Sequence, residues 1–340
     1  MSDSDQPIHM KSDPVLCIVI PTFNRAAFLD QCLAFAVEAI GDHAVPICIS
    51  DNCSSDNTAE VVKKWLAVYP LIRYSRNDAN MGPDRNFEMA LKMGQADYVW
   101  LLGDTYRITR ACVDHLIASL TDCTQGPDVV VLNVIGRVTD VPGTVFTDAN
   151  LLLTRLGWHM TCMSSLVYRR DVLAQAPYAR FRSTDFIQVG IIFESIENRP
   201  FAVKWVADQS VYPIIIGGVV KESWRPRVLQ VWVERWSNFV MSLPPSYVLA
   251  SKLACIKAHN SKSGLFSIGS MLSLRADNAF GWSVMGKYPN YLALNPARLI
   301  AARLIALIPV HLACALRNAI RLVRQKIKKF YVNKINSKLF

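Results

Sequence analysis

Short, unbroken apolar runs recur over the first hundred residues, with longer amphipathic stretches between them. Val15–Ile20 (VLCIVI) is such a run and stops at Pro21. Val45–Ser50 and Tyr98–Leu102 have the same character. Runs of this kind are typical of strands that are buried on both faces of a parallel sheet. Ala26–Ile40 instead carries apolar residues at helical spacing. The alternation predicts a right-handed β/α/β sheet.

The same criteria predict further elements on both sides of residue 128. The helices are Thr58–Val68 (with Asn57 or Thr58 as its cap), Asn86–Met93 and Phe186–Ile196, and the strands are Leu71–Ser75, Val129–Val134 and Thr161–Tyr168. Residues 221–281, rich in Trp, are expected to be mostly helical. The fold class is therefore α/β, with a mostly parallel sheet flanked by helices and a helical C-terminal segment.

Polar side chains gather where the predicted strands end. They are Thr22, Asn24 and Arg25 after the first strand, Asp51 and Asn52 after the second, and Asp104 after the fourth. Ligands of open α/β sheets lie beyond the carboxyl ends of the strands. At any single position an Asp or Asn could simply form a turn. Their presence at three strand ends favours a binding site.

Four motifs carry a resemblance to a known family: IVIPTFNR (18–25), ISDNCSSDNT (49–58), NMGPDRNF (80–87) and YVWLLGD (98–104). Together they resemble the donor half of the family-2 inverting glycosyltransferases, which have a GT-A fold. A fainter likeness through WHMTCMSS (158–165) and STDFIQVG (183–190) resembles the branch of abequosyltransferase-like and capsule or O-antigen sugar transferases. The resemblance implies an enzyme that moves a sugar from a nucleotide diphosphate sugar to an acceptor hydroxyl with inversion. The implied acceptor is a lipid-linked oligosaccharide of bacterial surface polysaccharide synthesis.

The resemblance also implies which residues meet the nucleotide sugar. They are Pro21, Thr22, Asn24, Arg25, Asp51, Asn52, Asn80, Gly82, Arg85, Gly103 and Asp104. Asp51 would accept hydrogen bonds from the base, since a carboxylate only accepts, and Arg85 would offer a fork of donors to phosphate or sugar oxygens. The alternatives are a turn aspartate and a solvated helix arginine.

Asp104 departs from the family's usual pattern. The family shows two or three acidic residues here, one for ribose and another for a divalent cation that bridges the diphosphate, whereas this chain reads Gly103-Asp104-Thr105-Tyr106. Asp104 would then be the one carboxylate on a Mg²⁺ or Mn²⁺ ion held mainly by phosphates and water. The alternative is that Arg107 and Arg85 neutralise the diphosphate. The missing acids also leave open a catalytically impaired scaffold that binds nucleotide sugar at a membrane.

The acceptor side carries less specific signals. By resemblance Asp185, in Ser183-Thr184-Asp185-Phe186, is the base that takes the acceptor proton, together with Asp104 in the catalytic set. An ordinary helix cap is the alternative for Asp185. The candidate acceptor-binding residues are Trp158, His159, Trp224 and Arg227. A structural role is the alternative for His159 beside its Trp.

Charge is concentrated at the C-terminal end. The chain has a net charge of +10, yet 11 basic residues follow Asp277, the last acidic one, and the other 26 basic residues face 27 acidic ones. This distribution argues against a nucleic-acid-binding body and favours a local electrostatic role for the tail. The nine scattered cysteines are expected to be reduced thiols, and the polar N-terminus carries no secretory signal pattern.

The tail itself is predicted to be helical from Pro296, with a break at Pro309. Leu304–Leu316 is apolar but has only 13 residues, short of the about 20 that a spanning helix needs. Apolar residues then recur every three or four positions among basic ones, at Leu316, Ile320, Val323, Ile327 and Tyr331. Residues 298–338 are thus expected to lie on an anionic membrane, peripherally and on the cytoplasmic side. The alternatives are a solvated packing helix, a nucleic-acid contact, or a re-entrant or marginal spanning segment at 299–316.

These patterns predict four segments. They are a disordered N-terminus (1–13), a GT-A nucleotide-sugar domain (14–215), a helical cap on the acceptor side (216–295) and basic amphipathic membrane-associating helices (296–340).

Overall fold

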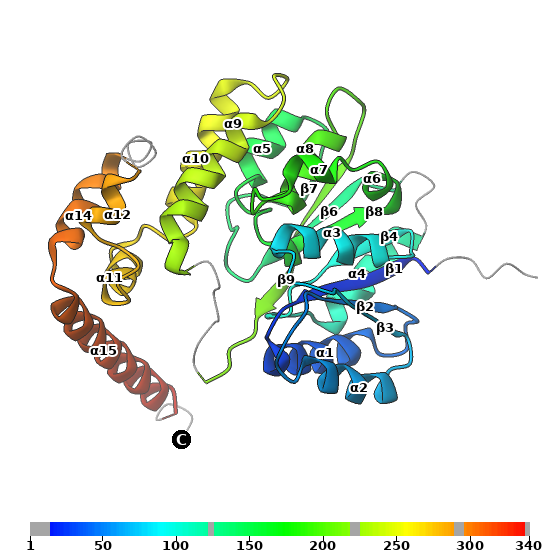
Figure 1. The fold of residues 1–340 in the computed structure, drawn as a ribbon, viewed down its shortest axis with the longest axis horizontal. Coiled ribbons are helices and arrows are strands. Elements are labelled where there is room, and N and C mark those ends of the chain that lie inside the picture. Colours follow the sequence, from blue (N-terminus) through cyan, green and yellow to red (C-terminus); the bar gives the residue numbers. More distant parts are fainter. Residues whose placement is uncertain (1–13, 122–125, 218–224, 289–295, 337–340) are drawn as a thin grey trace, which may run out of the picture. The chain divides into compact units, whose positions relative to one another are not determined.

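The structure, a computed structural model, describes residues 14–121, 126–217, 225–288 and 296–336, with side chains of the last helix up to Val323 (Figure 1). The chain divides into two compact units. Met1–Leu152 and His159–Lys221 form the first, and Leu153–Trp158 and Glu222–Phe340 form the second. Residues 1–13 lie outside the described part, and the predicted four-segment division stays a prediction.

The first unit is built on a nine-stranded mixed sheet with the strand order β3-β2-β1-β4-β8-β6-β9-β5, and β7 pairs with β9. Strands β1 to β4 are mutually parallel, β8 is antiparallel to β4 and β6, and β9 is parallel to β6. The strands are β1 (Leu16–Thr22), β2 (Ile47–Asp51), β3 (Ile72–Arg76), β4 (Tyr98–Leu101), β5 (Tyr106–Arg107), β6 (Val129–Val134), β7 (Thr144–Phe146), β8 (Leu166–Arg169) and β9 (Val203–Pro213).

The strand order reverses its direction between β1 and β4. The chain moves outward from β1 to β2 and β3 and then returns to β4, on the other side of β1. Because such crossovers are right-handed, α1 and α2 cover one face of the sheet and α3 the other. In agreement, α1 contacts α2 and α4, while α3 contacts α8 (Figure 1). The carboxyl ends of β1 and β4 thus flank the switch point at which α/β sheets bind ligands.

The helices of this unit are α1 (Ala26–Ile40), α2 (Thr58–Val68), α3 (Pro83–Met93), α4 (Arg110–Thr121), α5 (Ala149–Leu156), α6 (Arg170–Ala174), α7 (Tyr178–Phe181) and α8 (Ile187–Ser195), and α5 runs on into the second unit. The predicted bounds of α1, α2 and β6 are confirmed. α3 begins three residues earlier than predicted, because Pro83 suits the first helical position after Gly82.

The prediction that the first strand stops at Pro21 is wrong. β1 continues through Pro21 to Thr22, where Thr22 pairs with Asp51 of β2. Amides of alternate residues in a parallel strand point to opposite neighbours, so the nitrogen of Pro21 faces β4, as Val19 does. Pairing with β4 ends at Val19 and Leu101, and the missing N–H of Pro21 therefore costs no ladder bond.

The predicted strand over Thr161–Tyr168 is also wrong in its first half. Residues Met163–Ser165 form a 3₁₀ turn, and the strand β8 begins at Leu166. The pattern further missed α4, β5, β7 and β9. β9 mixes polar and apolar residues along its 11 positions and is buried irregularly, so it lacks both an unbroken apolar run and a strict alternation.

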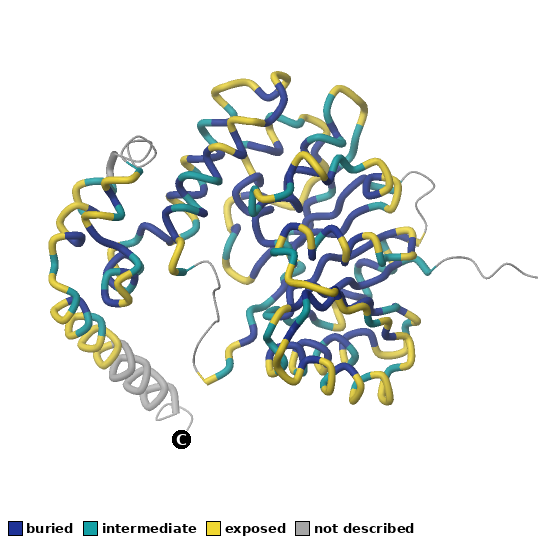
Figure 2. The backbone as a smooth tube through the Cα atoms, in the orientation of Figure 1, coloured by how far each residue is buried: buried dark blue, intermediate teal, exposed yellow. Residues whose placement is uncertain are grey.

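The core lies where the pattern placed it. All residues of β1, β2, β4 and β6 are buried, as Figure 2 shows for the sheet. Trp100 of β4 is fully buried and donates its indole N–H to the carbonyl of Ser164. Two-sided burial explains the unbroken apolar runs of these strands.

The second unit is helical. Its helices are α9 (Trp236–Ser242), α10 (Leu249–Lys262), α11 (Ile268–Ala276), α12 (Trp282–Gly286), α14 (Pro296–Leu307) and α15 (Val310–Asn336), with a 3₁₀ turn at Arg225–Arg227 and a π-helical turn at Gln230–Arg235. α11 packs on α14 and α15, and the predicted break at Pro309 is confirmed. Within the described residues, no single helix has the length and apolar content of a membrane span, whereas 298–307 and 310–323, bent by 115°, meet both criteria jointly.

Candidate nucleotide-sugar site

The carboxyl ends of β1 and β4 are joined by a buried carboxylate. The Thr22 hydroxyl donates to Oδ2 of Asp104 at 2.8 Å, and the Arg25 guanidinium donates to Oδ1 at 2.9 Å. Asp104 is 3% exposed, whereas the Arg25 side chain remains 19% exposed. A charge-assisted bond to a carboxylate fixes the guanidinium in place and leaves its other N–H donors free to meet an anion from solvent. The structure therefore brings three predicted residues together at the switch point.

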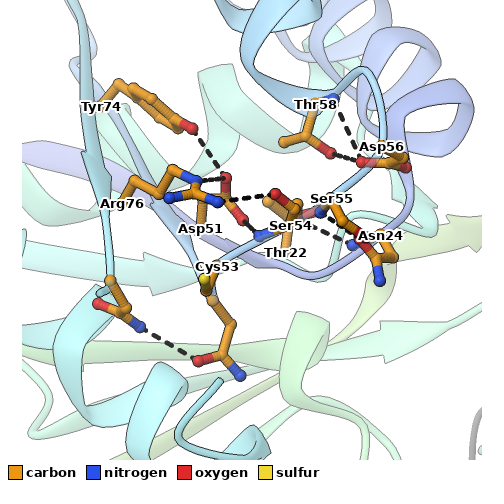
Figure 3. Close-up of polar contacts among 12 residues, drawn as sticks. Thr22, Asn24, Asp51, Cys53, Ser54, Ser55, Asp56, Thr58, Tyr74 and Arg76 are labelled. Atoms are coloured by element: carbon orange, nitrogen blue, oxygen red, sulfur yellow. Dashed lines mark hydrogen bonds and ion pairs between the residues drawn. The ribbon is translucent and has the colours of Figure 1, made fainter. Parts of the chain in front are cut away.

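Asp51 ends β2 and is held by its own surroundings. Oδ1 accepts the backbone N–H of Ser54 at 2.9 Å, and Oδ2 accepts the Tyr74 hydroxyl at 2.8 Å (Figure 3). Arg76 lies 3.7 Å from Oδ2. Burial, followed by the bond to Asp51, raises the pKa of the Tyr74 hydroxyl, which keeps it a donor. At 1% exposure, Asp51 shapes the β2 turn, and the structure shows no open face of its carboxylate toward a base.

The loops after β1 and β2 are bonded to one another. Asn24 has a φ of 51°, a left-handed conformation that Asn tolerates better than most residues. Its Oδ1 accepts the N–H of Ser55, and its own N–H donates to the Ser54 hydroxyl. Asp56 accepts the first N–H group of α1, at Ala26, and the first N–H group of α2, at Thr58. Figure 3 shows its contact with Thr58. These bonds fix the carboxyl ends of β1 and β2 to one another. The carboxyl ends of β1, β2 and β4, with the loops that follow them, are called the rim below.

Asn52 binds the turn that precedes α3. Its Nδ2 donates to Oδ1 of Asn80 at 2.8 Å and its Oδ1 accepts the N–H of Met81 at 2.9 Å. Gly82 adopts a φ of 82°, a backbone region that favours glycine. The predicted residues Asn52, Asn80 and Gly82 are therefore brought together by a turn-forming network.

Asn86 fixes the start of α3 over the same rim. Its Nδ2 donates to the backbone carbonyls of Thr22 and Ser50, at 3.3 and 3.1 Å. The preceding Arg85 is exposed and forms no hydrogen bond or ion pair with the described part of the chain. A guanidinium in this position is available to a solvent-borne anion.

Asp185 lies beside the first turn of the same helix. Its backbone N–H donates to Oδ2 of Asp84 at 2.9 Å, across 101 residues of sequence. Asp185 has a φ of 68° and is half-buried, and α8 begins two residues later with Phe186 as its cap residue. The alternative of an ordinary helix cap is therefore wrong. Burial, opposed by the bond from the Asp185 backbone N–H and aided by the neighbouring Asp185 charge, raises the pKa of Asp84 to about 6.

The residues around Asp104 do not make up a metal site. Both oxygens of Asp104 already have donors, one of them a cation, and a metal ion there would have to displace Arg25. Among the described residues, no three His, Cys, Asp or Glu side chains lie close enough to hold a metal ion. Arg107, the other predicted cation, lies over the rings of Phe35 and Tyr212.

Two predicted acceptor residues are buried. His159 has no exposed surface, its Nε2 lies 2.8 Å from the carbonyl oxygen of Leu132, and burial lowers its pKa to about 3. Trp158 is likewise fully buried and donates to the carbonyl of Arg155. The prediction that this pair stacks on a sugar is corrected, because both side chains fill the core. Arg227 is exposed in the second unit, and Trp224 lies outside the described residues.

Several side chains of the rim escaped the sequence analysis. Tyr74 and Arg76 lie on a strand with a mixed polar pattern, and their contact with Asp51 follows only from strand pairing. Asp56 had a local signal, since it lies two residues before Thr58 at the start of a helix. A surface hollow of about 550 Å³, lined by residues such as Asp171 and Arg199, was also not foreseen. It follows β8, at the amino end of β4, away from the rim.

The described cysteines are free thiols, in agreement with the prediction; Cys123 lies outside the described residues. Burial raises the pKa of Cys32, beneath the rim. A protonated, buried thiol is a packing group and offers no nucleophile to the site.

Comparison with known proteins adds three findings. Residues 17–176 match the family described as Glycosyl transferase family 2. A 92-residue stretch is 38% identical to the abequosyltransferase RfbV of Salmonella typhimurium. It covers 26% of this chain and 27% of that protein, so the match spans about a quarter of the curated relative.

The third finding is a likeness of fold. S. aureus TarS 1–349 in complex with UDP-GlcNAc superimposes with a TM-score of 0.53 at 16% identity, over 93% of this chain and 92% of that one. The mannosyltransferase PcManGT of Pyrobaculum calidifontis, in complex with GDP-Man and Mn²⁺, gives 0.52 at 15% identity, over 88% and 89%. At these identities the likeness supports the predicted GT-A fold.

Proposed function

We propose that the protein transfers a sugar from a nucleotide diphosphate sugar to an acceptor hydroxyl, because residues 17–176 match the family described as Glycosyl transferase family 2. The observation that carries the proposal is the Arg25–Asp104–Thr22 group at the switch point of the sheet. A buried carboxylate there presents a partly exposed guanidinium at the place where α/β sheets bind ligands. Arg85, in the first turn of α3, adds an exposed cation.

The reaction we propose is a single displacement with inversion. The acceptor oxygen attacks the anomeric carbon, the bond from that carbon to the diphosphate breaks, and the acceptor proton passes to the carboxylate of Asp185. Arg25 and Arg85 donate hydrogen bonds to the departing diphosphate, whose negative charge grows as the bond breaks. The residue types, the family match and the position of Asp185 beside α3 support this assignment.

We propose that a divalent cation binds together with the nucleotide sugar. PcManGT was solved with GDP-Man and Mn²⁺. Because Asp104 is paired with Arg25, we propose that any cation is held by the diphosphate and water. Mn²⁺ titrated into the protein alone should then bind no more tightly than about 1 mM, whereas nucleotide diphosphate should confer binding at least about tenfold tighter. Tight binding to the protein alone would contradict this.

We further propose a lipid-linked oligosaccharide as the acceptor, met at the cytoplasmic face of an anionic membrane. Side chains along α15 support the membrane part: Leu312, Leu316 and Ile320 are 48, 47 and 39% exposed, at helical spacing. Basic residues flank this exposed apolar stripe. A surface that is apolar along one line and cationic beside it fits an anionic bilayer interface.

The experiment that tests the transferase assignment has two parts. A thermal-shift screen with UDP, GDP, CDP and TDP should raise Tm for one nucleotide, because a ligand of the native state stabilises it. The matching activated sugar should then release nucleotide diphosphate in the presence of the protein. Binding without turnover would instead favour a scaffold that only holds the nucleotide sugar, and neither binding nor turnover would refute the proposal.

A further inference from the structure

Two residues of the turn that carries Asp185 adopt a backbone conformation that is unfavourable for residues other than glycine. Ser183 and Asp185 have φ values of 67° and 68°, and neither is a glycine. Such left-handed residues persist only where the surroundings hold them. The turn joins α7 to α8, and Thr184 restrains it locally through bonds to Phe181 and Phe186, while α3 adds contacts from outside the segment.

Asp84, in the first turn of α3, supplies one of them. Its carboxylate is 4% exposed and accepts the N–H of Asp185 at 2.9 Å. The backbone N–H groups of Thr184 and Ile187 also lower the pKa of this carboxyl, whereas its Oδ1 is buried and has no hydrogen-bond partner in the described part of the chain. Ile187 is the first residue of α8, so the carboxylate lies beside the turn and near the start of that helix.

Glu88 lies one helical turn further along α3 and holds the other end. The Arg182 fork donates to both of its oxygens, each at 2.8 Å, and Lys92 donates to one of them at 2.6 Å. A two-pronged arginine–carboxylate contact fixes orientation as well as distance. The turn 182–187 is therefore bonded to one face of α3 at two positions, Arg182 and Asp185.

The same helix, α3, is also bonded to the strand ends of the candidate nucleotide-sugar site. Asn86, between the two acids, bonds to the carbonyls at the ends of β1 and β2. α3 therefore links the rim that carries Asp104 to the turn that carries Asp185. A displacement of about 1 Å between reacting groups can cost a factor of about 100 in rate.

We propose that Asp84 and Glu88 are positioning residues for catalysis, which hold the turn 182–187 so that Asp185 faces the donor site. This inference rests on the proposed function, with Asp185 as the base. Asp84 and Glu88 act through the backbone and through Arg182, and touch neither donor nor acceptor.

The test compares Asp84→Ala, Asp84→Asn, Glu88→Gln and Asp185→Ala in the full-length protein. The readout is nucleotide diphosphate release to water from the activated sugar identified in the screen. Asp84→Ala should lower kcat about 10- to 100-fold with donor KM unchanged within about twofold, because donor contacts are intact. Asp84→Asn should recover to within about threefold of wild type, since its amide oxygen still accepts the N–H of Asp185.

A double-mutant comparison separates positioning from general structural damage. In the Asp185→Ala background, Asp84→Ala should cause no further loss beyond about twofold, because both changes remove the same function. Should Asp84→Ala fail to fold, Glu88→Gln provides the same comparison, with an expected loss of about three- to tenfold in kcat alone. Glu194→Gln, which breaks a similar acid–arginine pair between α7 and α8, is the matched control and should stay within twofold of wild type.

Losses that multiply in the double variant, an increase in donor KM at unchanged kcat, or full activity of Asp84→Ala would each overturn the positioning role while the transferase assignment survives. A wild-type protein that turns over no activated sugar would overturn the transferase assignment and the inference with it.

Discussion

At the scale of single residues, the pairing of Asp104 with Arg25 has the clearest consequence. Asp104→Asn removes the charge that holds the guanidinium in place, and a displacement of about 1 Å of a positioned group can cost a factor of about 100 in rate. We therefore expect donor turnover to fall at least about 30-fold. The fold should survive, because Arg25 still reaches solvent.

Activity assays and thermal unfolding of Asp104→Asn check this prediction. Asp30→Asn is the control, since Asp30 forms an exposed pair with Lys64 on the outer surface and should change turnover less than twofold. Wild-type turnover by Asp104→Asn would exclude Asp104 from the mechanism.

The raised pKa of Asp84 predicts that the free energy of unfolding depends on pH. Its folded pKa is raised from 3.8 to about 6, so the folded state holds this proton more tightly than the unfolded state. The associated stabilisation is complete below pH 3.8 and is lost as pH rises through about 6. Relative to Asp84→Asn, the wild-type free energy of unfolding should fall by roughly 1–3 kcal/mol between pH 4 and 7, as measured by urea unfolding.

Glu88 provides a control of opposite sign. Hydrogen bonds from Arg182, opposed by burial and aided by Lys92, lower its pKa from 4.5 to about 2. Its stabilisation is present above pH 4.5 and is lost as pH falls through about 2. The stability difference between wild type and Glu88→Gln should thus stay flat from pH 5 to 7. If the stability difference from wild type changed with pH in the same way for Asp84→Asn and Glu88→Gln, Asp84 would be excluded as the titrating group.

At the scale of elements, the packing of α7 on α8 depends on a glycine. A Cβ at Gly190 would lie 2.4 Å from ring atoms of Phe181, which is itself fully buried. Gly190→Ala should therefore destabilise the first unit by about 1–3 kcal/mol, a fall in Tm of roughly 2–10 °C.

Thermal unfolding of Gly190→Ala checks this packing. Gly143→Ala is its partner experiment, because a Cβ there makes only ordinary contacts, and its Tm should change by less than about 2 °C. Equal stability of the two variants would mean that α7 can move away from α8 at little cost.

Element prediction succeeded where a strand is buried on both faces. β1, β2 and β4 were found from their unbroken apolar runs, although β1 extends past Pro21. It failed for β9, whose polar and apolar residues follow no regular order and whose pairing with β5, β6 and β7 no local pattern encodes.

At the scale of the whole molecule, the tail can be tested without removing it. Truncation near residue 295 would strip Ala302, Ile305 and Ala306 from the core of the second unit, where they are buried. Substitution of the exposed apolar stripe on α15 leaves these core residues in place. Leu312→Ser, Leu316→Ser and Ile320→Ser together should weaken binding to phosphatidylglycerol-containing vesicles at least about tenfold, because apolar burial in the interface is lost.

Vesicle sedimentation at low and high salt measures this effect. The control is a triple serine variant of Leu66, Val68 and Leu71, which are exposed to a similar degree in the first unit. Binding of wild type should also weaken as salt rises, since cations of the tail contribute about 1 kcal/mol each near an anionic surface. Wild type that stays in the supernatant, or an equal loss in the control, would refute the membrane proposal.

The positions of the rim residues follow from the sequence pattern. Parallel strands must be buried on both faces and end together at one edge, so apolar runs followed by Thr22, Asp51 and Asp104 predict neighbouring polar groups whatever the details of packing. The hydrogen-bond partners and the burial of the site side chains could be read only from the folded structure. Arg25 bonds to Asp104, Asp84 bonds to the turn of Asp185, and His159 is buried. Each of these outcomes depends on partners many residues away, which side-chain packing selects and local pattern does not record.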